Sequence, residues 1–387
     1  MNMLADVPAT FSPDAPTSPL PAISRKSWLW SMPLTPWLNL GDELAENVVK
    51  TLRAHKKPLA QPLPAIQQLA REGNVACQDF LADMEMIPDW VDFELMAQGG
   101  AMAYRHFPQL IIALIHGGLM TTFSNAASAH ILSGTQRLEQ NVVRRLFESS
   151  TLFFGVLDTE ALRPYGAVWE ICMRVRLMHA MVRLRLMASE RWDMATGLPI
   201  NQLHTAAGPL FFGTMVLESL QALGAKIRPE EHEGYYLIWR YVTRLLGVPL
   251  GLLGNTVAEQ QAIDQRILPL CFDPNETSRQ LAQALFEGLK NLPDAHMVPK
   301  TVHEVLSRYL LGDEKANAMG IAQHPMAIRL IAPLAFGLRM YSWTLRIPQV
   351  GRSAEVFGKR YLDNLVQRGL AGVAADYQPH AHAGTGA

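Results

Sequence analysis

The stretch 171–192 sets a single histidine among arginines in an otherwise strongly apolar sequence. Residues three and four apart share one side of a helix, so Arg176, His179 and Arg183 are predicted to line one face. Two buried guanidinium groups without counter-charges would be costly. A bound group with negative charges and a metal ion would satisfy all three side chains. Heme is such a group, with His179 as the ligand of its iron and the two arginines on its propionates.

The same residues also fit a structural role. In that alternative His179 is a core histidine, and Arg176 and Arg183 form salt bridges with nearby carboxylates. Without further context, the structural role is the more common one for a single helix of this kind.

A second apolar stretch, 141–154, carries Arg145, Glu148 and Ser149 at positions i, i+3 and i+4. On a helix these side chains converge on one face. On the far side of a heme, Arg145 and Ser149 would donate hydrogen bonds to bound dioxygen, and Glu148 would act as a base or a weak axial ligand. The alternatives are an ordinary surface pair of arginine and glutamate, or a pairing of Glu148 with Arg144.

Other catalytic motifs are missing from the sequence. His106, His116 and His130 lie at separations that match no compact metal site. The chain has no HExxH, no GxSxG and no GxGxxG that follows a strand. These patterns argue against a zinc protease, an α/β-hydrolase and a dinucleotide-binding enzyme.

Composition narrows the partners and the compartment. The 387 residues carry a net charge of −1 and no basic block, so no nucleic-acid partner is expected. Cys77, Cys172 and Cys271 are far apart and form no CxxCH, which excludes covalently attached heme. Unpaired cysteines and the lack of a convincing secretory signal predict a cytoplasmic protein.

The uncharged stretch 107–136 resembles a membrane span only at first sight. Its unbroken apolar part is 110–115, which is far too short to cross a bilayer. We expect a buried helix pair and no transmembrane span. Weak membrane association remains open, because 49% of the residues are hydrophobic.

Helical periodicity dominates the chain, and clear period-two strands are absent. A Pro-rich extended arm is predicted over 1–36, one large all-α domain over 37–370 and a disordered tail over 371–387. Asp42 is expected near the N-cap of the first helix, and Asp89 is expected to cap a helix through 93–99. The main helices are expected at 101–116, 138–157, 165–192, 201–224, 229–246, 255–268, 276–290, 298–311 and 325–345.

Five segments, taken in order, resemble the bacterial latex clearing protein (rubber oxygenase) and MpaB oxygenase family. They are 88–100, 130–150, 175–186, 197–224 and 236–249. The resemblance implies an all-α fold with a globin-like core that holds non-covalent heme b. It also implies an enzyme that inserts dioxygen across a carbon–carbon double bond.

The resemblance places His179 at the family's proximal heme histidine, with Arg176 and Arg183 at the arginines beside it. Arg145 matches the distal arginine of an Arg-x-x-Lys-Thr motif. This chain departs from that motif, because Glu148 replaces the lysine and Ser149 replaces the threonine. The acidic base that rubber-cleaving members carry upstream has no counterpart between Glu94 and Glu139.

Two functions follow from these residues. The first is a heme b oxygenase that adds dioxygen to an apolar unsaturated substrate, such as an isoprenoid or a lipid, with a peroxygenase reaction as a variant. The second is a helical heme- or lipid-binding protein without turnover, which the loss of the distal lysine and of the upstream acid favours.

Overall fold

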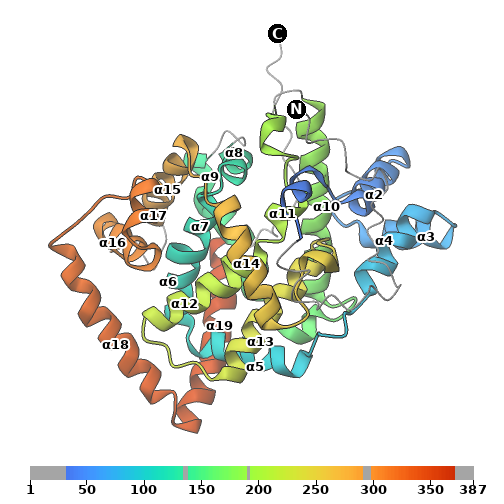
Figure 1. The fold of residues 1–387 in the computed structure, drawn as a ribbon. Helices are drawn as coiled ribbons and strands as arrows, with labels where there is room; N and C mark the ends of the chain where they lie inside the picture. The colour runs from blue at the N-terminus through green and yellow to red at the C-terminus, as the bar shows by residue number, and fades with distance from the viewer. Residues whose placement is uncertain (1–31, 134–137, 190–191, 291–297, 371–387) are drawn as a thin grey trace.

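The computed structural model describes residues 32–133, 138–189, 192–290 and 298–370, and within them the chain forms helices and no strand (Figure 1). The all-α prediction is confirmed. Most of the predicted arm and the whole predicted tail lie outside the described residues. The last residues of the arm enter a short 3₁₀ helix, η1 (Thr35–Asn39), instead of staying extended.

The order of elements follows the chain closely. The α-helices are α2 (Glu43–Ala54), α3 (Leu63–Arg71), α4 (Val75–Glu85), α5 (Phe93–Arg105), α6 (Phe107–Ala113), α7 (Met120–Phe123), α8 (Ala126–Ser133), α9 (Leu138–Gly155), α10 (Ala167–Ala188), α11 (Gln202–Thr205), α12 (Met215–Ala222), α13 (Pro229–Leu245), α14 (Val257–Cys271), α15 (Glu276–Leu289), α16 (Lys300–Leu311), α17 (Asp313–Ala318), α18 (Ile331–Thr344) and α19 (Pro348–Gly369). Shorter helical turns are η2 (Leu114–Leu119), η3 (Thr159–Leu162), η4 (Met194–Thr196), η5 (Pro209–Thr214), η6 (Leu250–Leu252) and η7 (Ala327–Leu330).

Helix starts depend on side-chain caps. Asp42 caps α2 as predicted, and its Oδ1 accepts a hydrogen bond from the Ala45 amide at 3.2 Å. The predicted cap of α5 is wrong by three residues. Asp92, not Asp89, accepts hydrogen bonds from the amides of Glu94 and Leu95, both at 3.0 Å.

The largest helix that the sequence did not predict is α19. Its apolar pattern is weak, and two glycines, Gly351 and Gly358, interrupt it. The structure explains Gly358, since a Cβ there would lie 2.0 Å from the Tyr104 carbonyl oxygen. Long-range packing against α5, rather than local propensity, therefore stabilises α19.

The centre of the molecule is the crossing of α5 and α13. A Cβ at Gly99 would lie 2.0 Å from the Tyr235 nitrogen, and a Cβ at Gly234 would lie 2.0 Å from the Leu95 oxygen. The two backbones are thus in direct contact at facing glycines. From Gly234 to Leu245 every residue of α13 is buried, so this helix forms the axis of the core.

No single helix in the described ranges has both the length and the apolar character to cross a membrane, which agrees with the prediction. The segment Phe107–Phe123 together with Ala126–Ser133 meets those criteria as a pair, with a bend of 99° between them. Leu110, Ala113 and His116 of this pair are buried against other helices.

We predict that Gly99→Ala lowers the free energy of unfolding by about 2 kcal/mol or more, because its methyl group cannot fit between α5 and α13. Urea denaturation followed by circular dichroism measures this. Gly337→Ala on α18 is the matched control, because nothing lies within 4 Å of a Cβ there. That variant should leave stability unchanged or raise it slightly. Equal effects of the two substitutions would contradict the packing argument.

Candidate functional site

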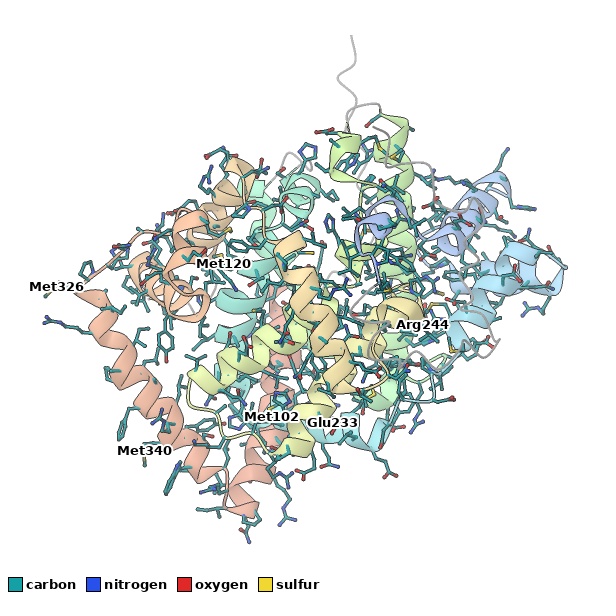
Figure 2. The ribbon with its side chains drawn as sticks, in the orientation of Figure 1. Met102, Met120, Glu233, Arg244, Met326 and Met340 are labelled. Carbon is teal, nitrogen blue, oxygen red and sulfur yellow. The ribbon has the colours of Figure 1, made fainter. Side chains whose placement is uncertain are left out.

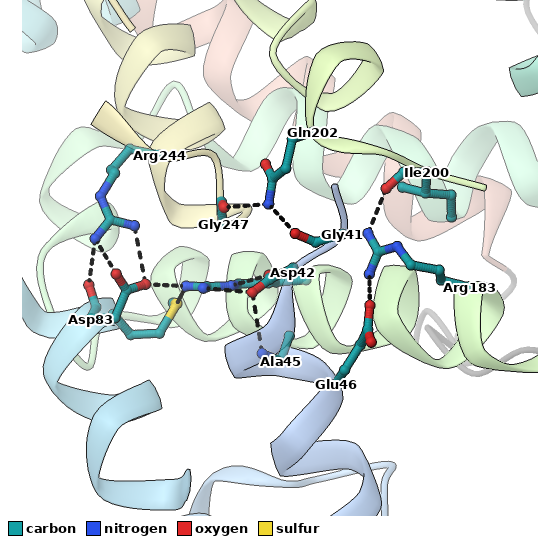
Figure 3. Close-up of polar contacts among 12 residues, drawn as sticks. Gly41, Asp42, Ala45, Glu46, Asp83, Arg183, Ile200, Gln202, Arg244 and Gly247 are labelled. Atoms are coloured by element: carbon teal, nitrogen blue, oxygen red, sulfur yellow. Dashed lines mark hydrogen bonds and ion pairs between the residues drawn. The ribbon is translucent and has the colours of Figure 1, made fainter. Parts of the chain in front are cut away.

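Arg176 is a fully enclosed cation on α10. Its side chain is 2% exposed, and its Nε and Nη2 donate to the two carboxylate oxygens of Asp42 at 2.6 and 3.1 Å (Figure 3). Nη1 donates to Asp83 Oδ2 at 2.5 Å. Burial opposes the charge, but Asp42 and then Asp83 outweigh it and raise the pKa of Arg176 above its ordinary value.

Asp83 joins a second arginine to this group. Arg244 Nη2 donates to Asp83 Oδ1 at 2.5 Å, and its Nη1 donates to Oδ2 at 3.1 Å. Burial alone would raise the pKa of Asp83, yet the guanidinium groups of Arg176 and Arg244 lower it below its usual value. Two aspartates therefore balance two arginines, and we call Arg176, Asp42, Asp83 and Arg244 the buried ion cluster.

The backbone makes room for the buried ion cluster at Gly247. This residue has φ of +92°, and a Cβ there would lie 2.1 Å from Asp42 Oδ2 and 2.6 Å from Arg176 Nε. Both the left-handed conformation and the close approach favour glycine. Gln202 fixes the loop, because its Nε2 donates to the carbonyls of Gly41 at 2.9 Å and of Gly247 at 3.1 Å.

Arg183 lies two turns further along α10 and is also buried. Its Nη1 donates to Glu46 Oε1 at 2.9 Å, and its Nε donates to the Pro199 carbonyl at 3.1 Å. Nη2 donates to the Ile200 carbonyl. Glu46 stands one turn after Asp42 on α2, so α2 supplies a carboxylate to each arginine of the α10 face.

These contacts differ from the expected contacts with heme propionates. Arg176 and Arg183 each have a protein carboxylate within hydrogen-bond distance. The structural alternative therefore describes the observed contacts of both arginines. Their assignment to a cofactor stays a prediction, and the charge balance of the site does not require a bound dianion.

His179 stands between the two arginines and is only partly exposed. Its Nδ1 is buried and has no hydrogen-bond partner in the structure. Burial, then the charge of Arg183, lowers the pKa of His179 to about 4, although Asp42 opposes the shift. The imidazole is therefore neutral at physiological pH, which is the form that can ligate a metal ion.

The distal residues lie on α9, in the predicted helix. The side chain of Arg145 lies outside the described side chains. Glu148 is half-buried, whereas Ser149 is exposed, and the buried hydroxyl is that of its neighbour Ser150, which donates to the Leu146 carbonyl at 2.7 Å. Exposure of Ser149 does not suit a donor inside a closed pocket, and the three assignments stay predictions.

A pair of histidines that the sequence did not connect lies elsewhere in the core. His116 on η2 and His303 on α16 stack with ring centroids 5.2 Å apart. His116 Nδ1 lies 2.8 Å from Ser307 Oγ, and its Nε2 lies 3.2 Å from His303 Nδ1. Burial, then the neighbouring imidazole, lowers the pKa of His116 to about 3. Among the described residues no three His, Cys, Asp or Glu side chains gather as a metal site.

The sequence indicated Arg176, His179 and Arg183 but missed the groups that neutralise the arginines. Asp83 lies 93 residues from Arg176 and 161 residues from Arg244 along the chain. Glu46 lies 137 residues from Arg183. No local spacing connects such residues. The only available signal was the cost of the buried charges themselves, which requires some counter-charge without saying which.

Comparisons with known proteins agree with the helical architecture. Residues 104–346 match the family model described as ER-bound oxygenase mpaB/B′/Rubber oxygenase, catalytic domain. A rubber oxygenase from Streptomyces sp. (strain K30) is 23% identical over 261 residues, which cover 66% of this chain and 63% of that protein. The solved structure of latex clearing protein LCP in the closed state has a TM-score of 0.64 at 18% identity and covers 87% of this chain and 95% of its own. That structural likeness concerns the fold.

We predict that Asp83→Asn destabilises the protein by about 3 kcal/mol at neutral pH, because it leaves two buried arginines with a single carboxylate. The native pKa of Asp83 is depressed, so its contribution is complete above about pH 4 and is lost as the pH falls through the native pKa. The stability difference from the parent protein should narrow in acid. Urea denaturation across pH measures it, with exposed Asp79→Asn on the same helix as control. A constant difference at all pH values would argue against the ionised pair.

Proposed function

Because the chain belongs to the mpaB and rubber oxygenase catalytic-domain family, we propose that it is a heme b-dependent oxygenase. Its substrate is an apolar unsaturated molecule, isoprenoid or lipid-like, whose double bond reacts with dioxygen and is cleaved to carbonyls. The name of the Streptomyces relative supports this substrate class. The three buried free cysteines support a cytoplasmic location.

The observation that carries the proposal is the state of His179. It lies inside the segment that matches the family model, on a helix whose neighbouring arginines are held by carboxylates. Its imidazole is neutral, and its buried Nδ1 has no partner among the described residues. A neutral, incompletely paired imidazole on a fixed helix suits an axial ligand of iron.

In this proposal the residues divide the work. His179 holds the heme, whose iron supplies the binding and activation of dioxygen. Arg176 and Arg183 fix the helix that presents His179, through Asp42 and Glu46. Glu148 accepts a proton from the allylic carbon of the substrate, and Arg145 and Ser149 orient dioxygen by hydrogen bonds. A peroxygenase reaction is a variant that uses the same groups.

A second candidate function is a heme- or lipid-binding protein without turnover. The exposure of Ser149 favours it, because a solvated hydroxyl gives little orientation to a bound ligand. Glutamate at position 148, where the resemblance leads one to expect lysine, points the same way. Product analysis separates the two functions, since only the oxygenase releases carbonyl compounds from an unsaturated substrate under air.

We predict that the purified protein, after growth with hemin, shows a Soret band and a b-type pyridine hemochrome. His179→Gly should lose the heme, and imidazole added to the buffer should restore part of the absorbance by replacing the missing ligand. His232→Ala, a half-buried histidine on α13, is the control and should keep its heme. Full heme occupancy in the His179→Gly protein without imidazole would remove this residue as the ligand.

We predict that Glu148→Gln keeps the heme spectrum but lowers product formation about a hundredfold, since the amide cannot accept the proton. Mass spectrometry of carbonyl products from a polyisoprene oligomer under air measures the loss. Glu94→Gln, an exposed glutamate in the first turn of α5, serves as the control. Unchanged turnover in Glu148→Gln would exclude the base role and leave heme binding as a separate question.

A further inference from the structure

The outward face of α18 is apolar. Figure 1 shows this helix along one edge of the molecule, and Figure 2 places Met326 and Met340 on that outer edge. Phe336 is 64% exposed, Trp343 is 55% exposed and Met340 is 47% exposed. Their spacing of four and three residues puts them on one stripe of the helix. We call the following residues the α18 face: Met326, Ile328, Phe336, Met340, Trp343 and Ile347.

The polarity of α18 is the reverse of that of an ordinary surface helix, which buries its apolar side. Ser342 is buried, and its Oγ accepts a hydrogen bond from the Lys226 amide at 2.8 Å. Tyr341 donates to the Arg105 carbonyl at 2.8 Å. The polar side chains thus hold α18 to the body, while the large apolar side chains face solvent. An exposed patch of this kind marks an interaction surface.

The charges around the α18 face have one sign. Four exposed arginines lie within 325–352, which contains no aspartate or glutamate. They are Arg329, Arg339, Arg346 and Arg352. The guanidinium of Arg346 lies 5.6 Å from the centre of the Trp343 ring, so charge and aromatic surface are adjacent. The next acid, Glu355, forms an ion pair with Arg105 at 3.2 Å.

We propose that the α18 face binds the surface of an anionic phospholipid bilayer, with the helix lying in the plane of the interface. Apolar and aromatic side chains would enter the headgroup boundary, and the arginines would meet the lipid phosphates. With 14 residues α18 is too short to span a bilayer, so the contact is peripheral. The proposal is independent of the heme chemistry and of any substrate.

A second copy of the chain is a weaker candidate for the same surface. Two-fold pairing brings the same patch of each copy together. Here it would set the arginines of one α18 face against those of the other, in a contact with no acid from the same segment to offset them. An anionic surface has the complementary charge.

A probe at position 340 tests the contact directly. The chain's cysteines are buried, so Met340→Cys can be labelled selectively with an environment-sensitive fluorophore. Its emission should shift to the blue with vesicles of phosphatidylcholine and phosphatidylglycerol, far less with phosphatidylcholine alone, and the shift should weaken at high salt. The same probe in Val75→Cys, exposed on α4, should not respond.

Substitutions then separate the apolar and the charge contributions in vesicle co-sedimentation. Phe336→Ser with Trp343→Ser, and independently Arg339→Gln with Arg346→Gln, should each lower partitioning about tenfold or more. Arg53→Gln with Arg71→Gln, exposed near the ends of α2 and α3, should leave it unchanged. Circular dichroism melting confirms that the variants are folded, and the labelled position 340 tests the proposal even if a variant is not.

Three outcomes would overturn the proposal. The first is an absent or equal response of the two probe positions to anionic vesicles. The second is equal binding to neutral and anionic vesicles, which removes the role of the arginines. The third is a blue shift at position 340 that depends on protein concentration without vesicles, together with a dimer in sedimentation velocity, which assigns the face to a second copy.

Discussion

Burial of arginine charge is the constraint on which the rest of this structure depends. Arg176 and Arg244 enter the core from α10 and α13, and Asp42 and Asp83 meet them from the start of α2 and the end of α4. Removing such charges from water costs several kcal/mol each, so the four groups are tolerated only together. The buried ion cluster therefore fixes four helices relative to one another. Loosening any one of them exposes or unpairs a charge.

The same constraint determines the chemistry available to His179. The imidazole shares the α10 face with Arg176 and Arg183, whose positive charges are fixed by carboxylates. A second positive charge on that face is unfavourable, and burial adds to the penalty, so the histidine stays neutral. Arginines that first suggested a site for a dianion act instead as the electrostatic surroundings of a neutral ligand.

The sequence allowed prediction of features that depend on local pattern. Helical periodicity located α9, α10, α13 and α15, and the acid at position 42 was recognised as a cap. Features that depend on distant contacts were out of reach. Gly99 and Gly234 meet across 135 positions, and nothing near either residue indicates the other. The α10 face was identified because its three residues are three and four apart, whereas its partners Asp42, Glu46 and Asp83 come from separate helices.

The position of those partners bears on where the functional unit begins. The family match starts at residue 104 and contains Arg176, His179, Arg183 and Arg244. All three carboxylates that neutralise the arginines lie before it, on the α2–α4 region. The matched segment by itself thus carries buried cations without their counter-charges. The helices at 43–85 complete its electrostatics, and the smallest part of this chain that can hold His179 neutral and in place includes them.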